Sequence, residues 1–210
     1  MSETIADHAY TPEEHAPDPV VSHGDPTRPG KIGIWLFLAS EIMFFIGILG
    51  TYIILRSGAP EMFAAHAHVL SKTAAGINTL VLIGSSLTVA LAVDAAQKGN
   101  RSRTALMLGL TILCAFGFLV IKYIEYTSHF HENMWPRTDT YLAVYFTMTG
   151  LHALHVIFGM SVNGYFWLAG PSYWAAGDRQ LLINRVENAG LFWHFVDIVW
   201  IFLFPVLYLL

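Results

Sequence analysis

The stretch IGIWLFLASEIMFFIGILGTYIIL, residues Ile32–Leu55, decides the class of fold. A membrane-spanning helix needs about 20 mostly apolar residues, and this longer stretch carries only one charged side chain, Glu41. Four further stretches meet the same standard, at about 73–96, 104–124, 141–168 and 189–210. The sequence therefore predicts an all-α, polytopic membrane bundle of five transmembrane helices.

The composition supports a lipid-facing protein. Of the 210 residues, 55% are hydrophobic and 12% are charged, about half the charged share of a soluble domain. The connections between the apolar stretches are short, so residues 31–210 are expected to form one membrane domain with no soluble domain attached. The net charge of -4 gives no reason to expect a nucleic-acid partner. The single cysteine, Cys114, excludes an internal disulfide and a cysteine-built metal site.

Residues 1–30 differ from the rest in composition, because acidic residues and prolines crowd there. Such a segment has too few apolar residues to form a core. It also lacks the basic start and apolar centre of a signal peptide. We expect a disordered, water-facing N-terminal tail.

Lysine and arginine counts predict the orientation, because cytoplasmic loops carry an excess of both. With the N-terminus inside, the outer segments hold four basic residues and the inner segments hold seven. The four are Arg56, Lys72, Lys122 and Arg137, and the seven are Arg28, Lys31, Lys98, Arg101, Arg103, Arg179 and Arg185. This bias predicts a cytoplasmic N-terminus and a C-terminus on the outer side.

Ionisable residues inside the membrane cost free energy, so the presence of each one needs a structural or functional explanation. Glu41 follows Lys31 by ten residues, about 15 Å along a helix, which places its carboxyl near the middle of the bilayer. Phenylalanines 37, 44 and 45 surround it in the sequence. Glu41 is either a carboxyl that takes part in proton relay or lipid contact, or an acid that hydrogen-bonds between helices for packing.

Two histidines share a face of the fourth predicted helix. His152 and His155 fall in a series with Tyr145, Met148 and Gly159 at steps of three and four, and such a polar face is expected to point into the bundle. Hydrogen bonds between helices are the favoured interpretation of both histidines. Metal or haem ligation is the alternative, but no other span offers a matching pair.

The fifth predicted helix carries Glu187, His194 and Asp197 at steps of seven and three, again on one face. His194 and Asp197 are expected to bond to each other or to a neighbouring helix. No nucleophile motif accompanies them, so hydrolysis is not expected. Lys122 and Glu125, near the predicted end of the third span, are expected to extend their charged groups to the membrane interface.

Four segments resemble motifs of subunit III of the haem–copper oxidases, in the order of that family. They are WLFLASEIMFF (35–45), KYIEY (122–126), YFTMTGLHALHV (145–156) and FWHFVDIVW (192–200). Together they extend the resemblance over nearly everything from residue 31 onward. Because the chain offers five spans where longer members have seven, it resembles the shortened bacterial form. One wall of the family's lipid cleft is then expected to be absent or to come from another subunit.

The resemblance implies an accessory subunit that is not catalytic on its own, within an oxygen-reducing, proton-pumping terminal oxidase. No haem, copper or other cofactor is expected in this chain, and the redox centres are expected in the partner subunits. The implied partners are subunit I as the main contact, subunit II, small subunits, phospholipids and a respiratory supercomplex. The polar positions that match the family's recurring ones are Glu41, His152, His155, Glu187, His194 and Asp197.

Several functions stay open from the sequence. A cytochrome c oxidase in a bacterial cell membrane is expected first, with a role in aerobic electron transport and proton uptake. The equivalent subunit of a quinol oxidase or of a nitric oxide reductase is the alternative. An independent transporter is the alternative of a different class. It would be indicated by broken helices in matched halves, and the predicted spans hold no proline before Pro205.

Overall fold

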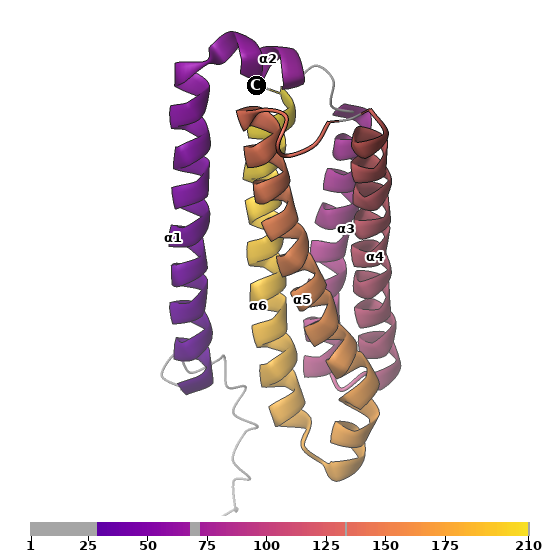
Figure 1. The fold of residues 1–210 in the computed structure, drawn as a ribbon. Helices are drawn as coiled ribbons and strands as arrows, with labels where there is room; N and C mark the ends of the chain where they lie inside the picture. Colours follow the sequence, from indigo (N-terminus) through magenta and orange to yellow (C-terminus); the bar gives the residue numbers. More distant parts are fainter. Residues whose placement is uncertain (1–28, 68–71, 133, 210) are drawn as a thin grey trace, which may run out of the picture.

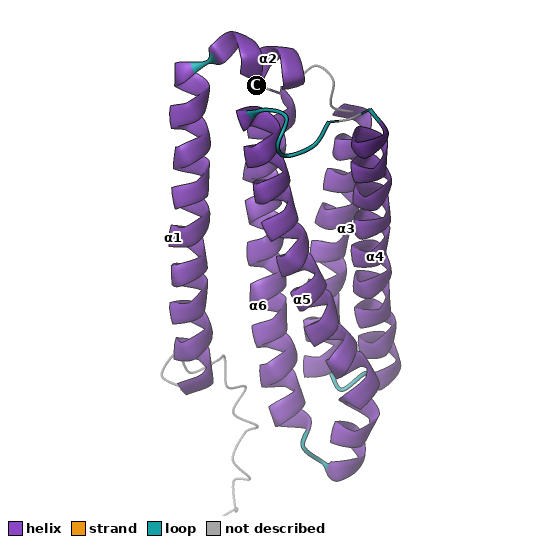
Figure 2. Ribbon diagram, in the orientation of Figure 1, coloured by secondary structure: helices purple, strands orange, loops and turns teal. Residues whose placement is uncertain are grey.

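A computed structural model describes residues 29–67, 72–132 and 134–209, and every regular element in these ranges is a helix (Figure 2). Their bounds are α1 Pro29–Gly58, α2 Pro60–Ala67, α3 Lys72–Gln97, α4 Arg101–His131, α5 Thr140–Ala176, α6 Arg179–Phe204 and the π-helix η1 Pro205–Leu209. Five helical spans in the described ranges are long and apolar enough to cross a membrane. The predicted five-helix membrane bundle is confirmed. Of the predicted tail, residues 1–28 lie outside the described residues.

Helices dominate because a bilayer core offers no water to the backbone, so each N–H and C=O group must be satisfied within its own segment. The helices extend beyond the apolar stretches on which the prediction was based. The helix α4 continues to His131, and α6 already begins at Arg179. The apolar stretch measures only the hydrocarbon layer, whereas helices continue into the headgroup region until a local signal ends them.

Local sequence signals set several of these ends. The side chain of Asn100 accepts a hydrogen bond from the backbone N–H of Arg103, at 3.0 Å, and so caps the start of α4. Asp139 caps α5 in the same way, with 2.9 Å to the N–H of Leu142. Gly99 and Gly177 have φ of 78° and 80°. Glycine adopts this left-handed conformation without a Cβ penalty, so the chain turns there.

The helices α3, α4, α5 and α6 form a four-helix bundle, and α1 stands beside it (Figure 1). The short helix α2 lies across one end of the molecule, next to η1 and the C-terminus. Aromatic rings fill the interior, such as Phe118 against Trp200 at 4.9 Å between ring centroids. The indole N–H groups of Trp193 and Trp200 donate to Ser85 and Thr79 of α3, each at 3.0 Å. These bonds fix α6 against α3.

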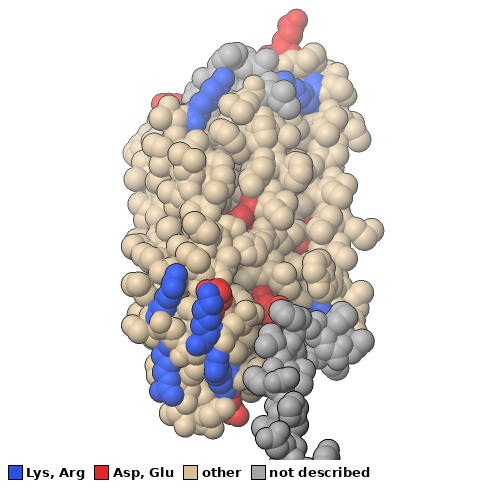
Figure 3. Space-filling model, turned by 180° about the vertical axis from the view of Figure 1, so that it is seen from behind, with Lys and Arg blue, Asp and Glu red and all other residues tan. Residues whose placement is uncertain are grey.

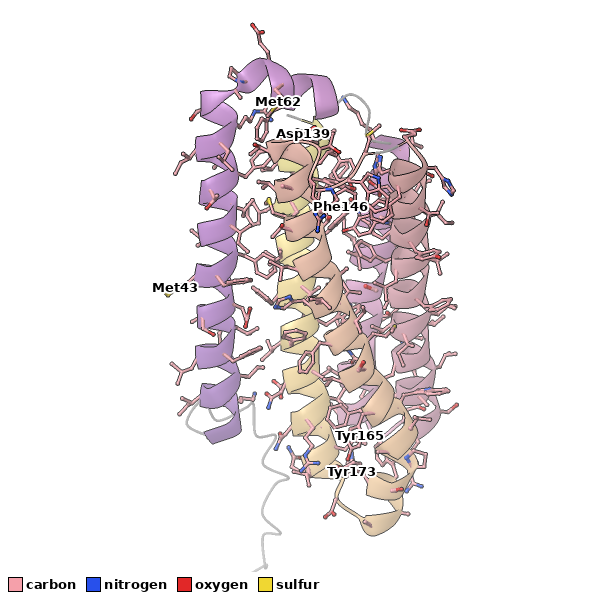
Figure 4. The ribbon with its side chains drawn as sticks, in the orientation of Figure 1. Met43, Met62, Asp139, Phe146, Tyr165 and Tyr173 are labelled. Carbon is pink, nitrogen blue, oxygen red and sulfur yellow. The ribbon has the colours of Figure 1, made fainter. Side chains whose placement is uncertain are left out.

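The helix α1 is the least buried span. Only 11% of its most apolar window is buried, against 56% for the span that begins at Arg179. Met43 is 75% exposed and points away from the bundle (Figure 4). Large apolar side chains on this helix therefore face lipid or another protein.

Candidate functional site

The carboxyl of Glu41, which the sequence places in the middle of its span, contacts a histidine of α5. The Oε2 atom of Glu41 lies 3.1 Å from the Nε2 atom of His155, and both side chains are mostly buried. The Nδ1 atom of the same histidine lies 2.8 Å from the carbonyl oxygen of Leu151. Two residues predicted as separate polar positions, 114 residues apart in the chain, are thus brought together by the approach of α1 to α5.

The two contacts of His155 determine which ring nitrogen carries a hydrogen. A carbonyl oxygen only accepts, so Nδ1 must carry a hydrogen and donate it to Leu151. The Nε2 atom then either accepts a hydrogen bond from a protonated Glu41 or, in a charged ring, donates one to the carboxylate. The contact with His155 thus gives the Glu41 carboxyl a polar partner inside the bundle.

Apolar grooves lie on both sides of α1. One groove, of about 530 Å³, runs between α1 and α6 and is lined by apolar side chains, with His194 as its polar residue. The other, of about 510 Å³, is bounded by α1, α5 and α6 and includes Arg185 and Asn188. Volumes of this size suit a ligand larger than a few waters. In a chain that crosses a membrane, such apolar grooves suit acyl chains or the apolar side chains of another protein.

The structure separates the three polar residues of α6 among different neighbours. Glu187 pairs with Lys31 of α1, with 2.8 Å between the charged atoms. The Nδ1 atom of His194 lies 2.6 Å from the hydroxyl of Ser86 on α3. Asp197 is buried and faces the same hydroxyl without meeting hydrogen-bond geometry. The expected bond of His194 to a neighbouring helix is present, whereas a direct bond to Asp197 is not.

His152 and His155 have different surroundings although they are one turn apart. His152 is fully buried between Phe118 and Trp200, at 5.6 and 5.1 Å between ring centroids. Neither of its ring nitrogens has a hydrogen-bond partner among the described residues. The expected hydrogen bond between helices therefore holds for His155 and not for His152. A step of three residues turns a helix far enough for the two rings to reach different neighbours.

Sequence reasoning missed a buried polar cluster near the end of the bundle that carries α2 and η1. Lys122 and Glu125 are 4% and 6% exposed, so the prediction that they extend to the interface was wrong. Their charged atoms lie 3.0 Å apart, and the hydroxyls of Tyr145 and Tyr208 each donate to Glu125 at 2.6 Å. Lys122 also donates to both tyrosines.

The error came from the expectation that a charged side chain near the end of a span faces the interface. The side chain of Lys122 instead faces the bundle, where α5 and η1 cover it. Its charge is paired there with Glu125. The signal that could have found this pairing is the presence of two tyrosines, Tyr145 and Tyr208, in otherwise apolar segments that the bundle brings alongside.

The described residues contain no group of three or more His, Cys, Asp or Glu side chains that could hold a metal ion. The polar residues instead form pairs and small clusters between helices. The arrangement can hold a proton at Glu41 and His155, and it can fix α1 to the bundle through that pair and through Lys31 and Glu187.

Comparison with known proteins relates this chain to one family of oxidase subunits. The family model of cytochrome c oxidase subunit III matches residues 21–210. The cytochrome c oxidase subunit 3 of Bacillus subtilis (strain 168) is 33% identical over 196 residues, which cover 88% of this chain and 89% of that protein. The subunit of the same name from Bacillus sp. (strain PS3) is 29% identical over 200 residues, with 91% and 92% covered.

A relative from another kind of oxidase is similarly close. The cytochrome bo(3) ubiquinol oxidase subunit 3 of Pseudomonas aeruginosa is 32% identical over 186 residues, which cover 85% of this chain and 83% of that protein. The family model spans all five membrane helices, including Glu41, His155 and the polar residues of α6. The chain belongs to the cytochrome c oxidase subunit III family.

Proposed function

We propose that this chain is the accessory, non-redox subunit III of a bacterial cytochrome c oxidase. The proposal is supported by the relatives named as cytochrome c oxidase subunit 3, which match along almost their whole length. The haem and copper centres would lie in the partner subunits, with subunit I as the main contact and subunit II and small subunits as further neighbours. Membership of a respiratory supercomplex belongs to the same proposal.

The observation that carries the mechanism is the contact between Glu41 and His155. The carboxyl oxygen and the ring nitrogen lie 3.1 Å apart, and this contact joins the weakly packed α1 to the bundle. We propose that it sets the position of α1 and of the lipids in the two grooves beside it. In this way the subunit would support proton uptake and the stability of the catalytic subunit without doing redox chemistry.

The remaining predicted polar residues have supporting roles in this proposal. Glu187 would hold the inner end of α1 through Lys31, since those charged atoms lie 2.8 Å apart. His194 would link α6 to α3 through Ser86 and present its ring to the groove between α1 and α6. His152 and Asp197 would act inside the bundle, where both are buried.

A quinol oxidase is the second candidate, and the Pseudomonas aeruginosa relative favours it specifically. Its identity of 32% is about that of the Bacillus subtilis cytochrome c oxidase subunit, 33%. The electron donor docks on other subunits, so this chain carries little information about it. In both cases we propose a bacterial cell membrane, with the N-terminus cytoplasmic and the C-terminus outside.

The test is to purify the complex through a tag on this chain in mild detergent, and to record its visible spectrum and its oxygen uptake. We expect a haem-bearing partner and oxygen consumption with reduced cytochrome c as the donor. Activity with a reduced quinol alone would assign the chain to the second candidate. Recovery of the folded chain alone and colourless would contradict the accessory-subunit proposal.

A further inference from the structure

A separate cavity lies at the inner end of the bundle, between the beginning of α4 and the end of α5. Its volume is about 160 Å³, and no residue of α1 lines it. The apolar part is formed by Leu108, Phe166, Trp167 and Leu182, and Arg101 stands at its rim. This volume is below the roughly 300 Å³ of sites for compact small molecules, so it fits a short length of acyl chain.

Two guanidinium groups lie near the ring of Trp174, which lines this cavity together with Arg101. The Cζ atom of Arg101 lies 5.2 Å from the centroid of Trp174, and that of Arg179 lies 5.9 Å from it. Arg101 also donates to the backbone oxygen of Trp174 at 3.4 Å, and Arg179 donates to that of Gln97. Contacts to a ring and to backbone oxygens position the cations but do not neutralise them.

The described residues at this end of the molecule carry more basic than acidic side chains, six lysines and arginines against Asp94, Asp178 and Glu187. Among the described residues, the carboxylates of Asp94 and Glu187 pair with Lys98 and Lys31, and no carboxylate forms an ion pair with Arg101 or Arg179. Lysine and arginine side chains gather at the same end in the view from behind (Figure 3). Nearby, Arg185 donates to the hydroxyl of Tyr173, which lies at this end of α5 (Figure 4).

We propose that this cavity is a binding site for an anionic phospholipid, with the phosphate on Arg101 and Arg179 and an acyl chain between α4 and α5. Guanidinium groups match the geometry of phosphate oxygens, and basic pockets between membrane helices on the cytoplasmic side suit anionic headgroups. The site combines this charge with an apolar lining that includes Leu108, Phe166 and Leu182. It depends only on the membrane-spanning fold, and so it is independent of the oxidase's electron donor.

The charge at the site is tested with Arg101→Gln, and Arg103→Gln is the matched control. Both arginines are exposed and lie in the first turn of α4, but Arg103 neither lines the cavity nor contacts Trp174. Losing a cation from a helix N-terminus does not weaken the helix. Native mass spectrometry of the purified full chain would compare phosphatidylglycerol and phosphatidylcholine with identical acyl chains.

We expect the unaltered chain to prefer phosphatidylglycerol. Arg101→Gln should weaken phosphatidylglycerol binding about fivefold, as expected for one cation near the membrane surface, and should leave phosphatidylcholine binding unchanged. Arg103→Gln should leave both unchanged. Equal losses in the two variants would show general surface attraction and would overturn the proposal, as would the absence of any preference for the anionic lipid.

The cavity is tested independently with Ala105→Leu, which places a larger apolar side chain in its lining. Ala90→Leu on α3 is the control, because Ala90 is also an exposed alanine of a membrane helix and does not line the cavity. Only Ala105→Leu should weaken the binding of phosphatidylglycerol. Unchanged binding in this variant, or displacement of the lipid by millimolar inorganic phosphate, would overturn the assignment of an acyl-chain site.

Discussion

Glu41 offers both a hydrogen bond to His155 and an ionisable carboxyl, and two substitutions of Glu41 separate these two features. Glu41→Gln keeps a hydrogen-bond donor for Nε2 of His155 but removes the ionisable carboxyl, whereas Glu41→Ala removes both. If the pair acts through its proton and the neighbouring lipids, both variants should assemble with the normal haem content. The oxidase should then lose activity faster during turnover than the unaltered enzyme does.

The measurement is the haem-to-protein ratio of the purified complex, followed by oxygen uptake over many turnovers. A complete loss of assembled, haem-loaded oxidase in Glu41→Ala, with normal assembly in Glu41→Gln, would assign the pair a packing role. Lifetimes equal to that of the unaltered enzyme in both variants would show that the shared proton has no part in maintaining activity.

Lys122 offers a second prediction at the residue scale. Its ammonium group is buried beside the carboxylate of Glu125, and removal of one member of a buried pair leaves the other charge uncompensated. We expect Lys122→Met to lower the free energy of unfolding by about 3–5 kcal/mol. The double variant Lys122→Met with Glu125→Gln should recover most of this loss. Denaturation in mixed micelles of the unaltered protein, of the single variants Lys122→Met and Glu125→Gln and of the double variant would measure the coupling, and additive losses would contradict it.

At the scale of the elements, the packing of α5 on α6 depends on one glycine. A Cβ atom at Gly159 would lie 2.7 Å from a ring carbon of Trp193 and 3.1 Å from one of Phe192. Small residues of this kind allow membrane helices to approach closely. Trp193 is itself held by its bond to Ser85, so its ring has little freedom to move aside.

We therefore expect Gly159→Ala to lower the free energy of unfolding by about 1–3 kcal/mol, the usual cost of overpacking a core. Gly164→Ala in the same helix is the control, because a Cβ there meets nothing within 4 Å. Its effect should be neutral or slightly stabilising, since alanine favours a helix over glycine. Thermal unfolding of both variants checks this, and equal stability of the two would contradict the close approach of α5 to α6.

At the scale of the whole molecule, the structure changes the charge count on which the orientation was based. Lys122 is buried inside the bundle, so it does not belong to an outer loop. Arg56, Lys72 and Arg137 remain for the outer side. The inner end keeps six basic residues among those described, namely Lys31, Lys98, Arg101, Arg103, Arg179 and Arg185. With Arg28 counted as before, the counts change from seven against four to seven against three, so the bias toward a cytoplasmic N-terminus is stronger than the sequence alone indicated.

Cysteine labelling tests this orientation. In a background with Cys114→Ala, we expect Glu132→Cys at the end of α4 to react with a membrane-impermeant maleimide in intact cells. Ser102→Cys at the opposite end of the same helix should react only after the cells are permeabilised. Both replaced residues are exposed. The reverse labelling pattern would place the N-terminus outside and reject the proposed topology.

The sequence by itself determined the five membrane spans and their order. These follow from the thickness of the bilayer and from the need of each backbone group for a partner within its own helix, which are local requirements. For the same reason Asn100 and Asp139 act as caps wherever the helices pack. The polar residues at Glu41, His155 and His194 were also found from sequence, because a polar group in an apolar run stands out.

Only the tertiary structure decided which of these groups meet. The partners Glu41 and His155, Lys31 and Glu187, and Ser86 and His194 come from different helices. Their contacts depend on how each helix is rotated about its axis and how closely it approaches its neighbours, and no periodicity within one segment specifies either quantity. The burial of Lys122 also depends on helix packing, because its partners in α5 and η1 lie beside it only in the packed bundle.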